Sequence, residues 1–246
     1  MEYGLIGKTL VHSYSKTIHG MIGDYGYELV SLPPEELDGF LRARDFKGIN
    51  VTIPYKKDVI PYCSEITERA KKIGSVNTVV NRDGLLLGHN TDYDGFAAMA
   101  ARAGVSFAGN RVLILGSGGT MLTASAVAED MGAADITVVS RTGPVTYAHL
   151  PDYYGYDIIV NTTPVGMFPN VEKCPLDIEP FTNLQGVLDV IYNPAETQLV
   201  RQAGNRGIPA ANGLYMLVVQ AVKAAELFLD RTFSDDLCER IMGAMA

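Results

Sequence analysis

Lys56 and Asp92 each follow a run of strand-forming residues, and their side chains could transfer a proton. Lys56 ends the stretch "GINVTIPYK", in which Pro54 prevents the strand from continuing its ladder. Asp92 follows "LLLGHN" and precedes an expected helix. A lysine and an aspartate that meet in a cleft can serve a carbonyl or hydroxyl group as acid and base. Two alternatives stay open, namely a solvated surface lysine and a helix cap formed by Asp92 or Asp94.

Two hydroxyl groups lie near the N-terminus in "HSYSK", just before a helix that we expect near 16–25. Ser13 and Ser15 fall on one side of an extended segment, and hydroxyls beside helix-terminal amides suit a carboxylate. A simple helix cap explains one of them equally well. No second acid or nucleophile is spaced to match His12, so we expect that histidine to be structural.

A glycine-rich turn follows the clearest strand of the chain, "RVLIL", and precedes a helix of small residues that ends at Gly132. Without side chains there, backbone N–H groups can approach a dinucleotide pyrophosphate at the helix N-terminus. Met121 stands where the dinucleotide fingerprint has its third glycine or an alanine. A tight structural turn is the alternative. The expected phosphate-binding residues are Gly116, Ser117, Gly118, Gly119 and Thr120.

The next strand ends in Ser140, Arg141 and Thr142, and this position usually selects the nicotinamide cofactor. An arginine suits a 2′-phosphate, so the sequence favours NADP, with NAD possible. The segment before Tyr156 is short and rich in glycine, proline and tyrosine, and an ordinary crossover helix hardly fits. We therefore expect an irregular crossover at 143–155 and weaker NADP affinity than a full cationic clamp would give.

The order of apolar runs predicts an α/β fold with two domains. Strand-like and helical segments alternate up to about residue 95, with a helix expected over 60–73 and a hairpin across 82–84. The continuous apolar runs that follow are typical of buried parallel strands in a Rossmann-like, doubly wound sheet. The helix over 213–230 is expected to return to the first domain, in the cleft between the two. The predicted domains are 1–95 with 213–246, and 96–212.

Composition excludes several other classes of protein. A net charge of −8 without a basic block opposes nucleic acid binding. Neither a secretory signal nor a membrane-spanning apolar run is evident in the sequence. Three cysteines lie far apart without metal-ligand spacing and read as reduced thiols, Cys63, Cys174 and Cys238. We expect a cytoplasmic protein, either a soluble enzyme or a binding protein.

Eight short motifs together resemble the shikimate dehydrogenase family, in order and along essentially the whole chain. They are "HSYS", "INVTIPYK", "VNT", "GHNTDYDG", "LGSGG", "NTTPVGM", "YNP" and "NGLYMLVVQ". The resemblance implies a substrate domain for shikimate, a Rossmann-like NADP domain, and C-terminal helices that return to the substrate domain. It further implies reversible NADPH-dependent reduction of 3-dehydroshikimate to shikimate in aromatic amino-acid biosynthesis, by a monomer or homodimer and without a metal.

The resemblance also implies roles for individual residues. Lys56 and Asp92 match the catalytic pair, while Ser13 and Ser15 match ligands of the substrate carboxylate. The pyrophosphate loop becomes 116–120, and 140–145 matches the adenosine-phosphate segment. Further substrate contacts are implied for Thr52, Asn77, Tyr192 and Gln220, and positions on the nicotinamide side for Val190, Gly213 and Glu68.

The chain departs from the family pattern in several places. Lys16 replaces a proline, Ser140 replaces an asparagine, and Val145 stands where the second basic residue of the phosphate clamp would be. Most departures concern the cofactor, so the substrate chemistry is the safer inference. Two alternatives follow, namely a quinate/shikimate dehydrogenase with relaxed substrate or NAD use, and a non-catalytic paralogue that senses a metabolite.

Overall fold

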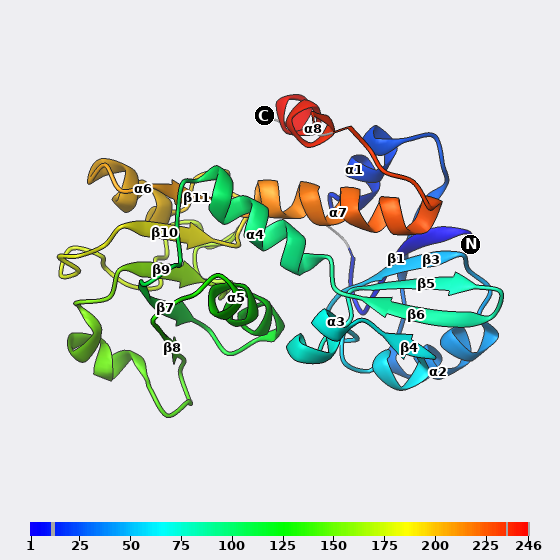
Figure 1. The fold of residues 1–246 in the computed structure, drawn as a ribbon, viewed down its shortest axis with the longest axis horizontal. Coiled ribbons are helices and arrows are strands. Elements are labelled where there is room, and N and C mark those ends of the chain that lie inside the picture. The colour runs from blue at the N-terminus through cyan, green and yellow to red at the C-terminus, as the bar shows by residue number, and fades with distance from the viewer. Residues whose placement is uncertain (11–12, 235, 246) are drawn as a thin grey trace. The chain divides into compact units, whose positions relative to one another are not determined.

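A computed structural model describes residues 1–10, 13–234 and 236–245, and His12 lies outside the described residues. The chain divides into two compact units (Figure 1). The first unit consists of Met1–Asp94 with Val218–Ala246, and the second of Gly95–Leu217. Each unit contains its own sheet with helices, so the predicted α/β class is confirmed.

The first unit contains a mixed six-stranded sheet in the order β2-β1-β3-β5-β6-β4. β1 is parallel to both β2 and β3, whereas β5 is antiparallel to β3 and to β6. The predicted hairpin is confirmed, and Asp83 and Gly84 both have positive φ at its turn, as a tight two-residue connection requires. The strands are β1 (Tyr3–Gly7), β2 (Tyr27–Ser31), β3 (Gly48–Val51), β4 (Glu65–Ile66), β5 (Thr78–Arg82) and β6 (Leu85–His89).

Six α-helices accompany this sheet in the described residues, and two of them, α4 and α7, continue into the second unit (Figure 1). No described helix is long and apolar enough to cross a membrane. The helices are α1 (Ser15–Ile22), α2 (Pro34–Ala43), α3 (Glu68–Ile73), α4 (Asp92–Arg102), α7 (Leu214–Leu229) and α8 (Leu237–Met245).

The expectation of one helix over 60–73 is wrong. A short 3-10 helix, η1 (Ile60–Tyr62), is followed by the edge strand β4 and then by α3. Thr67 starts α3 afresh, because its hydroxyl accepts a hydrogen bond from Ala70 N at 3.3 Å. β4 is parallel to β6, so pairing with the sheet overrides the helical pattern of this segment.

The C-terminal half of α7 packs on the first sheet, as expected for the returning helix. Phe228 is 2% exposed and stacks on Tyr3 with ring centroids 5.3 Å apart. A Cβ at Gly48 would lie 2.3 Å from the Phe228 ring, so this glycine makes the close approach possible. One apolar cluster thereby joins β1, near the N-terminus, to the C-terminal half of α7.

The second unit contains five parallel strands in the order β11-β10-β9-β7-β8. Counted from β7, this is the doubly wound order 2-1-3-4-5, which reverses between β7 and β9, and ligands of such sheets bind beyond the carboxyl ends of the strands at that reversal. The elements are β7 (Arg111–Leu115), α5 (Gly119–Asp130), β8 (Asp135–Val139), η2 (Tyr147–Tyr153), β9 (Ile158–Asn161), β10 (Gly186–Asp189), α6 (Gln198–Asn205) and β11 (Ala210–Ala211).

The crossover between β8 and β9 has the irregular form expected for 143–155. A 3-10 helix, η2, takes the place of an α-helix. Its first residues are held by reciprocal hydrogen bonds between Thr146 and His149. Tyr147 and Leu150 still pack against the core of this unit, so the short connection contributes apolar side chains as a crossover helix would.

Candidate active site

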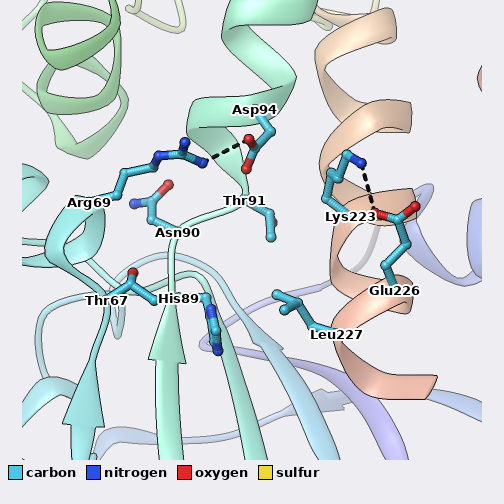
Figure 2. Close-up of a pocket in the computed structure, with 9 residues that line it drawn as sticks. All are labelled: Thr67, Arg69, His89, Asn90, Thr91, Asp94, Lys223, Glu226 and Leu227. Atoms are coloured by element: carbon cyan, nitrogen blue, oxygen red, sulfur yellow. Dashed lines mark hydrogen bonds and ion pairs between the residues drawn. The ribbon is translucent and has the colours of Figure 1, made fainter. Parts of the chain in front are cut away.

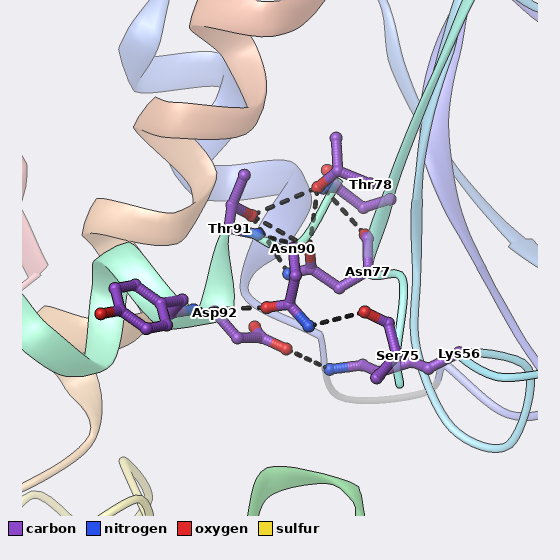
Figure 3. Close-up of polar contacts among 9 residues, drawn as sticks. Lys56, Ser75, Asn77, Thr78, Asn90, Thr91 and Asp92 are labelled. Carbon is purple, nitrogen blue, oxygen red and sulfur yellow. Dashed lines mark hydrogen bonds and ion pairs between the residues drawn. The ribbon is translucent and has the colours of Figure 1, made fainter. Parts of the chain in front are cut away.

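Lys56 and Asp92 meet in the first unit (Figure 3). Lys56 lies in the turns after β3, and Asp92 is the first residue of α4. The Nζ to Oδ2 distance is 2.5 Å, and the side chains are 22% and 13% exposed. An ammonium group has three N–H donors, so one can serve the carboxylate while another serves a substrate oxygen. Because both side chains are partly exposed, a substrate could still contact the pair.

Asn77 ties the start of β5 to the turn before Asp92. Its Oδ1 accepts from Thr91 N at 2.7 Å, and its Nδ2 donates to Thr91 Oγ1 at 3.1 Å. Asn77 is 2% exposed. The backbone on one side of Asp92 is thereby fixed to the neighbouring strand.

Asn90 caps α4, a role that the sequence alone leaves open between Asp92 and Asp94. The Oδ1 atom of Asn90 accepts from Tyr93 N at 3.3 Å. Asp94 instead forms an ion pair with Arg69 at 2.8 Å. Both cap alternatives are wrong, and the Asp92 carboxylate is left to bind Lys56. An asparagine three residues before the capped amide is the sequence signal that could have identified Asn90.

The predicted carboxylate ligands lie at the start of α1. Ser15 is the first residue of this helix and is 8% exposed. Ser13 Oγ accepts from Ser15 N at 3.2 Å, but Tyr14 is the N-cap residue of α1 and no side chain caps this helix, so the simple-cap alternative is wrong. Thr52 follows β3, and its methyl group packs against Gly7. A Cβ at Gly7 would lie 2.5 Å from the Thr52 methyl carbon, so the glycine makes room for this side chain.

The remaining residues expected near the substrate and the nicotinamide are spread over several elements. Gln220 lies on the part of α7 that belongs to the first unit and is 9% exposed. Tyr192 follows β10 in the second unit. Glu68 begins α3, and its 89% exposed side chain pairs with Lys71 at 2.5 Å. No hydrogen bond among the described residues joins Glu68 to the Lys56–Asp92 pair, and its cofactor role stays a prediction.

A cavity of about 340 Å³ adjoins the Asn90–Thr91 turn (Figure 2). Its charged groups form two pairs, Arg69 with Asp94 at 2.8 Å and Lys223 with Glu226 at 2.7 Å. Burial, followed by the Arg82 charge, lowers the pKa of His89. None of the predicted site residues lines it. The lining consists of Thr67, Arg69, His89, Asn90, Thr91, Asp94, Lys223, Glu226 and Leu227.

The glycine turn after β7 fits a dinucleotide phosphate. Gly116 has φ 103°, and a Cβ there would lie 2.9 Å from Thr162 Oγ1. Backbone conformation and packing therefore already favour glycine at this position without any bound phosphate. At Gly118 and Gly119 no described atom lies within 4 Å of the point that a Cβ would occupy. Gly118 precedes α5 without a side-chain cap, which leaves the first amides of a 12-residue helix for an anion.

The end of β8 presents Arg141 at the surface. Ser140 N donates to Val145 O at 3.1 Å, which closes a tight turn over 140–145. Ser140 is 6% exposed, whereas Arg141 and Thr142 are exposed. A guanidinium held at the edge of such a turn can bind a phosphate. These residues fit the adenosine side of NADP.

Val190 and Gly213 are brought together in the second unit. A Cβ at Gly213 would lie 2.0 Å from Val190 O, so only glycine permits this approach of two backbones. The neighbouring Asp189 is fully buried. It is not among the residues selected from the sequence, although an acidic residue inside an apolar strand is a pattern that indicates a buried polar site. Burial raises the pKa of Asp189 to about 6, against the opposing effect of hydrogen bonds from Thr197, Ile191 N and Asn161.

Known proteins resemble this chain along its whole length. A family profile described as the shikimate dehydrogenase substrate binding domain matches residues 5–79. A shikimate dehydrogenase (NADP(+)) of Clostridium beijerinckii is 35% identical over 257 residues, covering 96% of this chain and 95% of that protein. The crystal structure of a chorismate mutase/shikimate 5-dehydrogenase fusion protein from Clostridium acetobutylicum has a TM-score of 0.93 at 37% identity, with 99% and 96% of the two chains covered. Shikimate 5-dehydrogenase from Thermus thermophilus, in complex with NADP(H) and shikimate, has a TM-score of 0.87 at 27% identity, with 100% of each chain covered.

Proposed function

The chain belongs to the shikimate dehydrogenase family, and we propose that it reduces 3-dehydroshikimate reversibly to shikimate through Lys56 and Asp92. It is an NADP-dependent oxidoreductase. The contact between the Lys56 ammonium and the Asp92 carboxylate carries the residue assignment, because the two groups come from separate segments and meet at 2.5 Å.

The proton step follows from this contact. Reduction of a ketone requires a proton at the oxygen as negative charge develops there, and an ammonium group supplies it. Lys56 donates that proton, and Asp92 holds the lysine in place and accepts a hydrogen bond from the reacting hydroxyl in the reverse direction. When bound, NADPH supplies the hydride to the ketone carbon.

The other substrate contacts are proposed for polar groups of several segments. Ser13 and Ser15 bind the carboxylate, supported by their place beside the first amides of α1. The ring hydroxyls and the carboxylate are shared among Thr52, Asn77, Tyr192 and Gln220. The Asn77 side chain already binds Thr91, so its contact with substrate would also report on the position of Asp92.

For the cofactor, we propose the glycine turn 116–120 for the pyrophosphate and Ser140, Arg141 and Thr142 for the adenosine phosphate. Val190, Gly213 and Glu68 are proposed for the nicotinamide side. Residues 1–95 with 213–246 then form the substrate domain and 96–212 the NADP domain. A cytoplasmic location is proposed as well, supported by Cys63, Cys174 and Cys238, which are all free thiols.

Replacement of Lys56 by methionine tests the assignment, since methionine retains an apolar chain of similar length without the ammonium group. Turnover should fall by about 10²–10⁴-fold, with a much smaller change in KM for shikimate. NADPH absorbance measures both. Lys47→Met is the matched control, because Lys47 forms an exposed pair with Glu2 at 2.7 Å. A Lys56→Met enzyme with near-normal turnover would refute the assignment.

The same assay separates the alternatives. Shikimate and quinate are each offered with NADP⁺ and with NAD⁺, and we expect shikimate with NADP⁺ to give the highest kcat/KM. Higher kcat/KM with quinate or with NAD⁺ would favour the relaxed quinate/shikimate dehydrogenase. If the protein binds its ligands but none of the four combinations gives turnover, the metabolite sensor would be favoured.

A further inference from the structure

We propose that Asn90 is a positioning residue that holds both Lys56 and Asp92 in their reactive arrangement; this proposal rests on the proposed function of that pair. Asn90 is 3% exposed and makes two hydrogen bonds of opposite sense (Figure 3). Its Oδ1 accepts from Tyr93 N at 3.3 Å, and its Nδ2 donates to Ser75 O at 2.9 Å. One side chain thus connects two backbone segments.

The first hydrogen bond acts on Asp92. It fixes Tyr93, the residue after Asp92, while Asn77 fixes Thr91, the residue before it. The backbone of Asp92 is therefore held on both sides by side-chain amides. Without the Asn90 cap, the amides of the first turn would need another acceptor. An aspartate in that turn can supply one, and capping would draw the Asp92 carboxylate away from Lys56.

The second hydrogen bond acts on Lys56. Ser75 O accepts from Asn90, and the next residue, Val76, donates its N–H to Lys56 O at 2.8 Å. Ser75 is 2% exposed and Val76 is fully buried, so this segment has little freedom to move. Asn90 therefore links the backbone of the lysine to that of its carboxylate through a single buried amide.

The chemistry of this position requires a donor and an acceptor at once. Aspartate keeps the acceptor for Tyr93 N but lacks the donor for Ser75 O, and alanine lacks both. Asn90→Ala should lower kcat by roughly tenfold to a hundredfold, the range expected when a catalytic group is displaced by about 1 Å. Asn90→Asp should also lower kcat, because its second carboxylate oxygen would face another acceptor, Ser75 O, at a buried position. KM for shikimate should change far less than kcat in both variants.

A second readout distinguishes positioning from simple loss of folded protein. A displaced lysine slows proton transfer relative to the other steps, so the solvent deuterium isotope effect on kcat should rise in both Asn90 variants. Fewer folded molecules would lower the apparent kcat without changing the isotope effect. If Asn90→Ala does not fold, Asn90→Asp carries the test, because it retains the helix cap.

Asn81 provides a matched control. It is also an asparagine of the first sheet with both senses of hydrogen bond, since its Nδ2 donates to Arg44 O and Phe46 O while its Oδ1 accepts from Gly84 N at 2.9 Å. Asn81→Asp should lower the melting temperature, with kcat and the isotope effect unchanged.

The double variant Lys56→Met/Asn90→Ala decides whether Asn90 acts through Lys56. We expect no loss of kcat beyond that of Lys56→Met alone, because effects of residues that act as a unit are not additive. An additive loss, or an Asn90→Ala enzyme with wild-type kcat and isotope effect, would overturn the proposal while leaving the catalytic assignment intact. Normal turnover of Lys56→Met would instead overturn the proposed function.

Discussion

At the scale of single residues, Arg141 carries the expected choice between the two nicotinamide cofactors. It is exposed at the end of β8, and the position of a second basic residue is taken by Val145, whose carbonyl closes the turn onto Ser140. In the proposed cofactor site, the cationic contact with a 2′-phosphate would therefore depend on one guanidinium.

Removal of that guanidinium should weaken the use of NADPH and spare that of NADH. We expect Arg141→Ala to lower kcat/KM for NADPH by roughly tenfold to a hundredfold, the equivalent of about 1.5–3 kcal/mol for a hydrogen bond to a charged group. Steady-state assays with both cofactors measure the ratio. Arg201→Ala removes an exposed arginine paired with Glu196 in the same unit and should leave the ratio unchanged. An equal loss for both cofactors would contradict the phosphate role.

His19 is a buried base in the first unit. Its ring stacks on Tyr27 with centroids 3.7 Å apart, and its Nδ1 lies 2.5 Å from the Tyr25 hydroxyl. Burial lowers the pKa of His19 from 6.5 to about 3, so the folded protein holds a neutral imidazole. In the unfolded chain the same histidine takes up a proton near its ordinary pKa.

This difference predicts a dependence of stability on pH. Stability contributed by neutral His19 is fully present above pH 6.5 and is lost as pH falls toward 3, by up to about 1.4 kcal/mol per pH unit. His19→Phe keeps an aromatic ring against Tyr27 but cannot titrate. Urea unfolding at about pH 7.5, 6 and 5 should therefore give a shallower decline for His19→Phe than for the wild type. Parallel declines would show that His19 is not the source.

At the scale of elements, the backbone contact between the loop after β10 and the start of α7 depends on Gly213. A Cβ at this position would lie 2.0 Å from the Val190 carbonyl oxygen, and backbone atoms have little room to give way. Gly204 lies in α6 of the same unit, where no described atom lies within 4 Å of the corresponding point.

We expect Gly213→Ala to destabilise the protein by about 1–3 kcal/mol, as overpacking does, and to raise KM for NADPH. Gly204→Ala should instead be neutral or stabilise the protein by up to about 1 kcal/mol, because alanine is the better helix former. Thermal unfolding and NADPH kinetics measure both variants. A Gly213→Ala protein as stable as Gly204→Ala would argue against the close contact.

The elements also show what the sequence could predict. The strands of the second unit were predictable because continuous apolar runs are typical of buried parallel strands, and the Asp83–Gly84 turn was predictable because both residues tolerate positive φ. Lys56 was also predictable as a site residue, because Pro54 ends the strand before it and ligands often bind at strand ends. Segment 60–73 was not predictable, because β4 forms only by pairing with β6, a contact between residues distant in sequence. "HNTDYD" contains several possible caps, and only the position of Ser75 and Lys56 in space selects Asn90.

At the scale of the whole molecule, the two units invite a test of which ligand each one binds. Hydrogen exchange measured by mass spectrometry should show protection by shikimate alone in Met1–Asp94 and Val218–Ala246. NADP⁺ alone should protect amides of Gly95–Leu217, most strongly around 116–121 and 140–143. Protection in the opposite units would contradict the domain roles, whereas Lys56→Met should leave both patterns as in the wild type.

The Lys56–Asp92 pair is built entirely within the first unit, from segments that follow β3 and β6 of one sheet. The glycine turn and Arg141 belong to the other unit. Under the proposed residue roles, substitutions that change the coenzyme preference would therefore leave the groups that deliver the proton unchanged. Laboratory evolution of coenzyme preference should accordingly accumulate its substitutions between 95 and 217, and chimaeras that exchange this stretch between homologues should inherit the coenzyme of the donor and the acid–base chemistry of the recipient.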